Sequence, residues 1–129
     1  MLMVDSSFLI SLFTNKEERN ARSVELWSGI SETCVITDHI LEETIDWLMN
    51  NCGSEFAYGV GRRILDNSRM KIVYADEQKV ELGLEILKKY AGLSLCDSLS
   101  VLVMKENGIS KILSYDSDFD RFRGIVRIH

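Results

Sequence analysis

The first feature of this sequence that could do chemistry is a set of acidic residues that interrupt apolar segments. Asp5 separates "LMV" (2–4) from "FLI" (8–10), two strongly apolar runs. A carboxylate on an apolar surface costs free energy unless it is paired with a cation or hydrogen-bonded. Among the 20 Asp and Glu residues, those that break an apolar pattern are therefore the candidates for a functional role.

Glu43 is the second such acid. It lies three residues after Ile40 and four before Trp47, so it interrupts the apolar stripe of a helix predicted over 38–51. A boundary side chain that reaches water explains the same position. Glu42 is the neighbouring alternative, but it falls on the polar face of that helix, and we therefore favour Glu43 as the functional acid.

Two more acids stand at the borders of apolar elements. Asp97 precedes the apolar segment "LSVLVM" (99–104), and Asp116 follows the predicted strand "KILSY" (111–115). Structural explanations exist for both, because Ser94 and Asp97 have the spacing of a helix capping box and acids favour the start of a helix. Asp116 nevertheless occupies the same place after its strand as Asp5 does after its own.

The four acids are best explained together as one metal site. Two follow strand ends and two lie in early helical turns at the same edge of the predicted sheet. Carboxylates that crowd together are tolerated around cations, and oxygen ligands favour Mg²⁺ or Mn²⁺ over zinc. The only histidines are His39 and His129, and the three cysteines form no CxxC pair, so no site for a softer metal competes.

The elements that would position these acids alternate between strand and helix. Short apolar strands are predicted at 2–4, 34–36, 71–75, 111–115 and 124–128, and helices at 16–30, 38–51, 55–67, 76–90 and 96–108. Gly59 and Gly61 are expected to weaken the third of these helices. The alternation predicts a single α/β domain over 1–129, a three-layer α/β/α sandwich with a central parallel sheet of about five strands. Ligands bind outside the carboxyl ends of the strands in such sheets.

Composition narrows the class of protein. A formal charge of −5 argues against a protein that coats nucleic acid, because such binding depends on Lys and Arg, but it does not exclude a nuclease. No apolar stretch approaches the roughly 18 residues needed to span a membrane, and the first residues do not resemble a signal peptide. We therefore expect a cytoplasmic protein with no membrane partner.

At these acids the sequence resembles the PIN-domain ribonucleases, particularly the VapC-type toxins of prokaryotes. The outline of that family is a strand ending in Asp-Ser/Thr-Ser/Asn, a helix with a Glu, an Asp that opens an apolar helix, and a final Ser/Thr-x-Asp-x-x-Phe. The corresponding segments here, in the same order, are Asp5-Ser6-Ser7, "ILEET" (40–44) with Glu43, "LCDSLSVLVMKENG" (95–108) with Asp97, and "SYDSDF" (114–119) with Asp116. Together they extend over nearly the whole chain.

The resemblance implies metal-dependent hydrolysis of RNA phosphodiester bonds. Mg²⁺ or Mn²⁺ would supply a water of lowered pKa and a counter-charge for the phosphate. The implied catalytic and metal-binding residues are Asp5, Glu43, Asp97 and Asp116, with Asp118 as an additional or alternative ligand. The implied supporting groups are Ser6 and Ser114, which would orient the carboxylates, and the cations Arg62, Arg63 and Arg121, which would contact RNA.

The resemblance also implies partners, namely a second copy in a homodimer and a small antitoxin whose segment fills a groove near the site.

Two alternative functions stay open at this stage. One is a receiver-like aspartyl-phosphate domain, with Asp76 as phosphoacceptor, although it would need an acidic pair after the first strand and a lysine near the last. The other is a non-catalytic PIN-fold module that binds RNA or protein.

Overall fold

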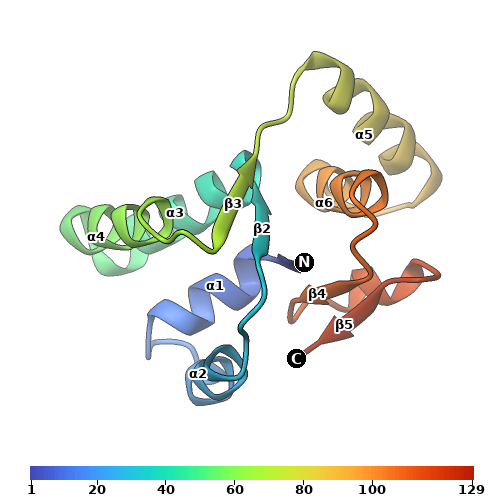
Figure 1. The fold of residues 1–129 in the computed structure, drawn as a ribbon. Coiled ribbons are helices and arrows are strands. Elements are labelled where there is room, and N and C mark those ends of the chain that lie inside the picture. Colours follow the sequence, from blue (N-terminus) through green and yellow to red (C-terminus); the bar gives the residue numbers. More distant parts are fainter.

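The central sheet has five parallel strands. The computed structural model describes all residues, 1–129. The strands lie in the order β3-β2-β1-β4-β5 (Figure 1). Their bounds are β1 (Leu2–Val4), β2 (Cys34–Thr37), β3 (Met70–Val73), β4 (Lys111–Leu113) and β5 (Val126–Ile128). All neighbouring pairs are parallel, which confirms the predicted sheet.

Six α-helices cover the sheet in two groups. They are α1 (Ser6–Phe13), α2 (Asn20–Ser28), α3 (Asp38–Cys52), α4 (Ser54–Leu65), α5 (Glu77–Lys89) and α6 (Leu95–Glu106), and a 3-10 helix, η1, spans Ser117–Arg121. In Figure 1, α1 to α4 lie on one side of β2 and β3, and α5 and α6 lie on the other. The predicted three-layer sandwich is confirmed. None of these helices combines the length and apolarity that a membrane crossing requires.

The strand order places a topological switch point at the centre of the sheet. From β1 the chain moves outward through β2 to β3, then returns to build β4 and β5 on the opposite side of β1. In open parallel sheets the crevice at such a switch point is where ligands bind. The carboxyl ends of β1 and β4, and therefore Asp5 and Asp116, lie at this crevice.

The apolar character of α6 follows from its central place. Its residues from Ser98 to Met104 are all buried. It packs closely on α5 because Gly83 leaves room, and a methyl group there would come within 3.0 Å of the Leu99 side chain. The helix that carries Asp97 is therefore buried along its middle and packed closely on α5.

Several predicted boundaries were wrong. The helix expected from residue 16 begins only at Asn20, because the Asn20 side chain binds the carbonyl oxygens of Ser11 and Leu12 and docks the start of α2 on the end of α1. The strands expected to reach residues 75 and 115 end at Val73 and Leu113.

The two glycines in α4 do not interrupt the helix. Gly59 and Gly61 lie inside a continuous helix. The helix packs along α3, where the space above Gly61 is limited by the Ile45 side chain at 3.4 Å. Tertiary packing of this kind outweighs the intrinsic preference of glycine.

Candidate metal-binding and active site

Asp5 forms the buried floor of the site. Its carboxylate accepts hydrogen bonds from the hydroxyls of Ser7, at 2.6 Å, and Ser114, at 2.8 Å. The side chain does not cap α1, so a helix-capping role does not account for it. Burial raises the pKa of Asp5 above its ordinary value, the two hydroxyls oppose that rise, and the charge of Glu43 adds to it.

Three further carboxylates converge beside this floor. Asp97, Asp116 and Asp118 each offer an oxygen, and these three oxygens lie within 4.8 Å of one another. Asp97 comes from the first turn of α6, and the other two come from the segment after β4. The structure thus brings Asp118 into the cluster, as the sequence had allowed.

The structural explanations considered for two of these acids are partly correct. The helix cap of α6 is Ser94, whose hydroxyl accepts the Asp97 backbone N–H at 3.1 Å. The Asp116 carboxylate caps η1 by accepting the Asp118 backbone N–H at 2.9 Å. Each carboxylate keeps an oxygen directed to the shared cluster, so capping and clustering occur together.

Asp97 has a strongly raised pKa as well. Burial raises its pKa from 3.8 to about 7, the charge of Asp5 contributes next, and Asp116 and Glu43 add smaller contributions in the same direction. The Ser94 hydroxyl opposes the rise. Titratable groups with strongly shifted pKa values gather at functional sites, because such sites concentrate like charges away from water.

Glu43 lies at the outer edge of the site. Its carboxylate accepts a hydrogen bond from the Ser6 hydroxyl at 2.5 Å and one from the Cys96 thiol at 3.7 Å. It is not one of the three clustered acids, but its charge raises the pKa of Asp5 and Asp97. Burial and the surrounding carboxylates also raise the pKa of Cys96, so that this thiol stays protonated.

Serine hydroxyls connect the acids into one network. Ser114 donates to Asp5 and accepts the Asp116 backbone N–H at 3.0 Å. Ser7 also donates to Asp5, and it accepts the Tyr115 backbone N–H at 3.0 Å. Ser6 and Ser114 were predicted to orient carboxylates, and both contact one. Ser7 was missed, although its place two residues after a strand-end aspartate was a usable signal.

The three arginines predicted to contact RNA differ in position. Arg121 lies beside the acids, with a guanidinium nitrogen 3.7 Å from Asp118. Arg62 pairs with Asp66 one turn later in α4. Arg63 lies over the Phe13 ring and lines a separate pocket. Only Arg121 therefore accompanies the acidic cluster directly.

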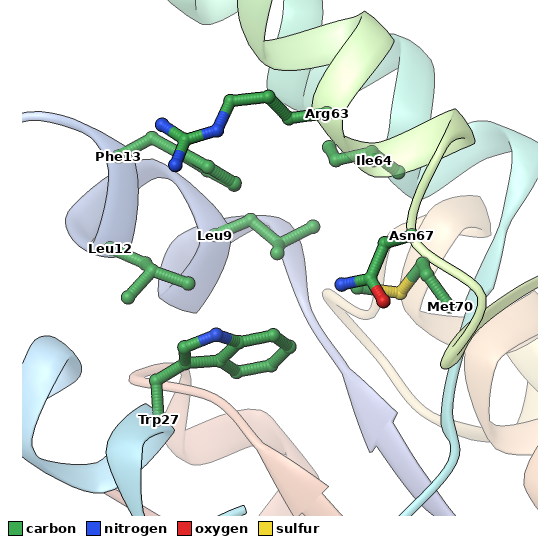
Figure 2. Close-up of a pocket in the computed structure, with 8 residues that line it drawn as sticks. All are labelled: Leu9, Leu12, Phe13, Trp27, Arg63, Ile64, Asn67 and Met70. Atoms are coloured by element: carbon green, nitrogen blue, oxygen red, sulfur yellow. The ribbon is translucent and has the colours of Figure 1, made fainter.

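That separate pocket is an apolar cavity of about 240 Å³ between α1, α2 and α4 (Figure 2). Figure 2 shows the Leu9, Leu12 and Phe13 side chains of α1 facing it, with Trp27 opposite and the Arg63 guanidinium above Phe13. None of the clustered acids lines it.

Residues 2–125 match the family described as PIN domain. The chain belongs to the PIN domain family. It is 27% identical over 120 residues to the 23S rRNA-specific endonuclease VapC20 of Mycobacterium tuberculosis, a match that covers 92% of both chains. The crystal structure of VapC20, described as a Sarcin-Ricin loop cleaving toxin, has a TM-score of 0.91 at 24% identity and covers 99% of this chain and 98% of that one.

Two further solved structures share the fold at lower similarity. A toxin–antitoxin complex from Klebsiella pneumoniae has a TM-score of 0.69 at 16% identity. VapBC2 from Rickettsia felis, bound to a DNA fragment from its promoter, has a TM-score of 0.68 at 15% identity. Each covers 98% of this chain and 96% of the other.

The predicted family and fold are confirmed, and the receiver-like alternative is wrong. Receiver domains have the strand order 2-1-3-4-5, whereas this chain places β1 between β2 and β4. Asp76, the phosphoacceptor in that alternative, caps the start of α5 by accepting the Lys79 backbone N–H.

Proposed function

We propose that this PIN-domain protein is an endoribonuclease that hydrolyses RNA phosphodiester bonds with divalent metal ions, as the toxin of a toxin–antitoxin pair. The observation that carries the proposal is the convergence of Asp97, Asp116 and Asp118 within 4.8 Å beside buried Asp5. The endonuclease activity named for the VapC20 relative supports it.

The donor set fits Mg²⁺ or Mn²⁺. The three clustered acids present oxygen atoms only, which hard divalent cations prefer. Burial first, and then the charges of neighbouring carboxylates, raise the pKa of Asp5 and Asp97, and a bound cation would stabilise their ionised forms. Asp97, Asp116 and Asp118 would hold an ion, and Asp5 and Glu43 would add negative charge beside it. When bound, the ions supply a water of lowered pKa and a counter-charge for the phosphate and the leaving oxygen.

The chain's own residues hold the carboxylates in place before RNA arrives. Ser7 and Ser114 fix Asp5, and Ser6 fixes Glu43. Preorganised groups of this kind lose little free energy to rearrangement during the reaction. Arg121 places a positive charge 3.7 Å from Asp118, where it can attract the RNA backbone to an otherwise acidic surface.

The direct test is cleavage of unstructured and structured RNA by purified protein with Mg²⁺ or Mn²⁺ and with EDTA. The variants Asp5→Asn and Asp97→Asn, beside Asp46→Asn as a control on exposed α3, complete the experiment. We expect cleavage that requires metal and is lost in the first two variants only. Cleavage that persists in EDTA would exclude a role for the metal. Cleavage that persists in both site variants would exclude a role for these acids. RNA binding without any cleavage would favour the non-catalytic alternative.

The apolar pocket of Figure 2 suits the antitoxin. A cavity lined by Leu9, Phe13 and Trp27 fits an apolar side chain, and Arg63 at its rim fits an acidic group beside it. Exposed Phe56 and Val24 extend the apolar surface around this pocket. The toxin–antitoxin complex with the same fold from Klebsiella pneumoniae supports a partner of this kind.

The remaining expectations concern assembly and place of action. We expect a homodimer, which sedimentation or light scattering of the purified protein will test. We expect the protein to act in the cytoplasm, where its RNA substrate is made. A monomer at micromolar concentration would contradict the first of these expectations without affecting the nuclease proposal.

A further inference from the structure

A second cavity opens directly beside the acids and is not part of the metal cluster. It has a volume of about 290 Å³ and lies between α1, α3 and the connection from α1 to α2. Its lining residues are Ser6, Ser7, Ile10, Ser11, Glu17, Arg19, Glu43 and Trp47. Ser6 and Glu43 belong to the acidic network as well, so the cavity and the acidic site share a wall.

Arg19 is held at this cavity by an aromatic stack. Its guanidinium carbon lies 4.7 Å from the centroid of the Tyr115 ring. That ring stacks on Phe8 at 5.9 Å, and its hydroxyl forms a 2.8 Å hydrogen bond with Ser23. The Arg19 backbone is fixed too, because its carbonyl accepts the Ser23 N–H at the first turn of α2. Both the ring and the backbone therefore keep the guanidinium near the site.

The charge of Arg19 is available to a ligand. The ion pairs of this protein involve other cations, and no carboxylate lies within ion-pair distance of Arg19. A guanidinium offers planar, paired donors that match phosphate oxygens, and its faces stack on aromatic rings. An arginine stacked on an aromatic ring, unpaired and beside an acidic metal site, is suited to hold a phosphate of the substrate.

Trp47 provides the apolar wall of the same cavity. It lies one helical turn after Glu43 on α3, so the two side chains project from the same face. The indole is only half-buried, which leaves part of its ring accessible from the cavity. Unpaired RNA bases stack on aromatic side chains in this way, whereas paired bases are stacked within their own helix.

We infer that this cavity binds one unpaired nucleotide of the RNA substrate, next to the phosphate at the acidic cluster. The base contacts Trp47, and Arg19 contacts a phosphate. A volume of about 290 Å³ is at the lower limit for a small-ligand pocket and suits one nucleotide rather than a helix. Glu17, the remaining charged group of the lining, repels phosphate and accepts N–H donors of a base. This inference rests on the proposed nuclease function and gives it a substrate subsite.

The test compares Arg19→Ala with Arg22→Ala in steady-state cleavage of a short single-stranded RNA. Arg22 is a matched control because it pairs with Glu25 on the exposed surface of α2. We expect Arg19→Ala to raise KM about 10-fold and to reduce the salt dependence of binding by about one ion, the effect of losing one phosphate contact. Arg22→Ala leaves both unchanged. An unchanged KM in Arg19→Ala would overturn the inference.

Two substitutions at Trp47 test whether RNA binding requires an aromatic ring at this position. Trp47→Phe keeps an aromatic surface and Trp47→Ala removes it, and thermal unfolding of both variants identifies any loss of folding. Base stacking predicts that Trp47→Ala weakens RNA binding about 10-fold while Trp47→Phe weakens it much less. Equal binding by folded Trp47→Ala and the parent protein would contradict the subsite.

Binding measured without cleavage separates this inference from the proposed function. In an Asp97→Asn background, fluorescence anisotropy of a labelled single-stranded RNA reports binding alone. Loss of binding with Arg19→Ala in that background supports the subsite even if the parent protein cleaves no RNA. If Arg19→Ala and Trp47→Ala change neither metal-dependent cleavage nor RNA binding, the subsite is refuted. The proposed nuclease function is unaffected by that result.

Discussion

Replacing Asp97 by asparagine should stabilise the metal-free protein while it removes metal binding. The carboxyl of Asp97 has its pKa raised from 3.8 to about 7, first by burial and then by the charge of Asp5. Near pH 8 the folded, metal-free chain must hold this group ionised beside other carboxylates. Asparagine keeps nearly the same shape without the charge, so the repulsion disappears.

The size of the expected stabilisation follows from the raised pKa of Asp97. A pKa raised from 3.8 to about 7 corresponds to a free-energy difference of about 4 kcal/mol between the two protonation states of Asp97. Asp97 is only half-buried, and water screens its charge, so we expect roughly 1–2 kcal/mol of stabilisation in the variant. For a chain of this length that corresponds to about 4–8 °C in Tm.

The sign of the pH dependence of stability follows from the same raised pKa. A carboxyl whose folded pKa lies above its unfolded value favours the folded state below about pH 4. That contribution is lost as the pH rises through about 7, the folded pKa of Asp97. The advantage of Asp97→Asn over the parent protein should therefore be absent near pH 4 and complete near pH 8.

Thermal unfolding in EDTA at pH 4 and at pH 8 measures this effect. Asp46→Asn makes the same chemical change at an exposed position of α3 and should change Tm little at either pH. Adding Mg²⁺ or Mn²⁺ at pH 8 should raise the Tm of the parent protein and not that of Asp97→Asn. An Asp97→Asn protein that is less stable than the parent at pH 8 in EDTA would refute the view that these carboxylates repel one another.

Three further predictions follow from the site. Ser114→Ala should destabilise the protein by about 1–2 kcal/mol, since buried Asp5 and the Asp116 N–H each lose a partner, and denaturant unfolding beside the cleavage rate will measure it. Metal affinity, followed by calorimetry, should fall steeply below pH 7 because Asp97 binds a proton there, and a flat profile would contradict this. Arg63→Glu should abolish co-purification with an antitoxin and leave RNA cleavage unchanged, because Arg63 lines the apolar pocket away from the acids.

The kinds of elements and the candidate acids could be predicted from the sequence. Short apolar strands alternate with helices, and that pattern requires parallel strands whose carboxyl ends share one edge. Asp5 and Asp116 follow strands directly, so the edge on which they lie is a local property of the sequence. Helix ends were less predictable, because packing against neighbouring elements outweighs local preference, as at the start of α2.

Other predicted contacts depended on information that the sequence does not carry. Arg62 and Arg63 are adjacent cations in the sequence, but α4 places one in an ion pair with Asp66 and the other at the apolar pocket. Arg19 gave no signal in its charged segment "KEER" (16–19), and its role as a candidate substrate contact depends on Tyr115, far away in the chain.

The family, the α/β architecture and the acids that could act were all readable from the amino-acid order, since strand-end position and apolar pattern are local. Which of these acids lie close together depends on the folded arrangement of the strands and helices. The order β2-β1-β4 brings residues after β4 beside Asp5, and the packing of α6 adds Asp97, so that carboxylates from separate segments converge. Distances between such segments are set by how strands and helices pack, and no local pattern encodes them. The serine hydroxyls that hold Asp5 are likewise a product of that packing.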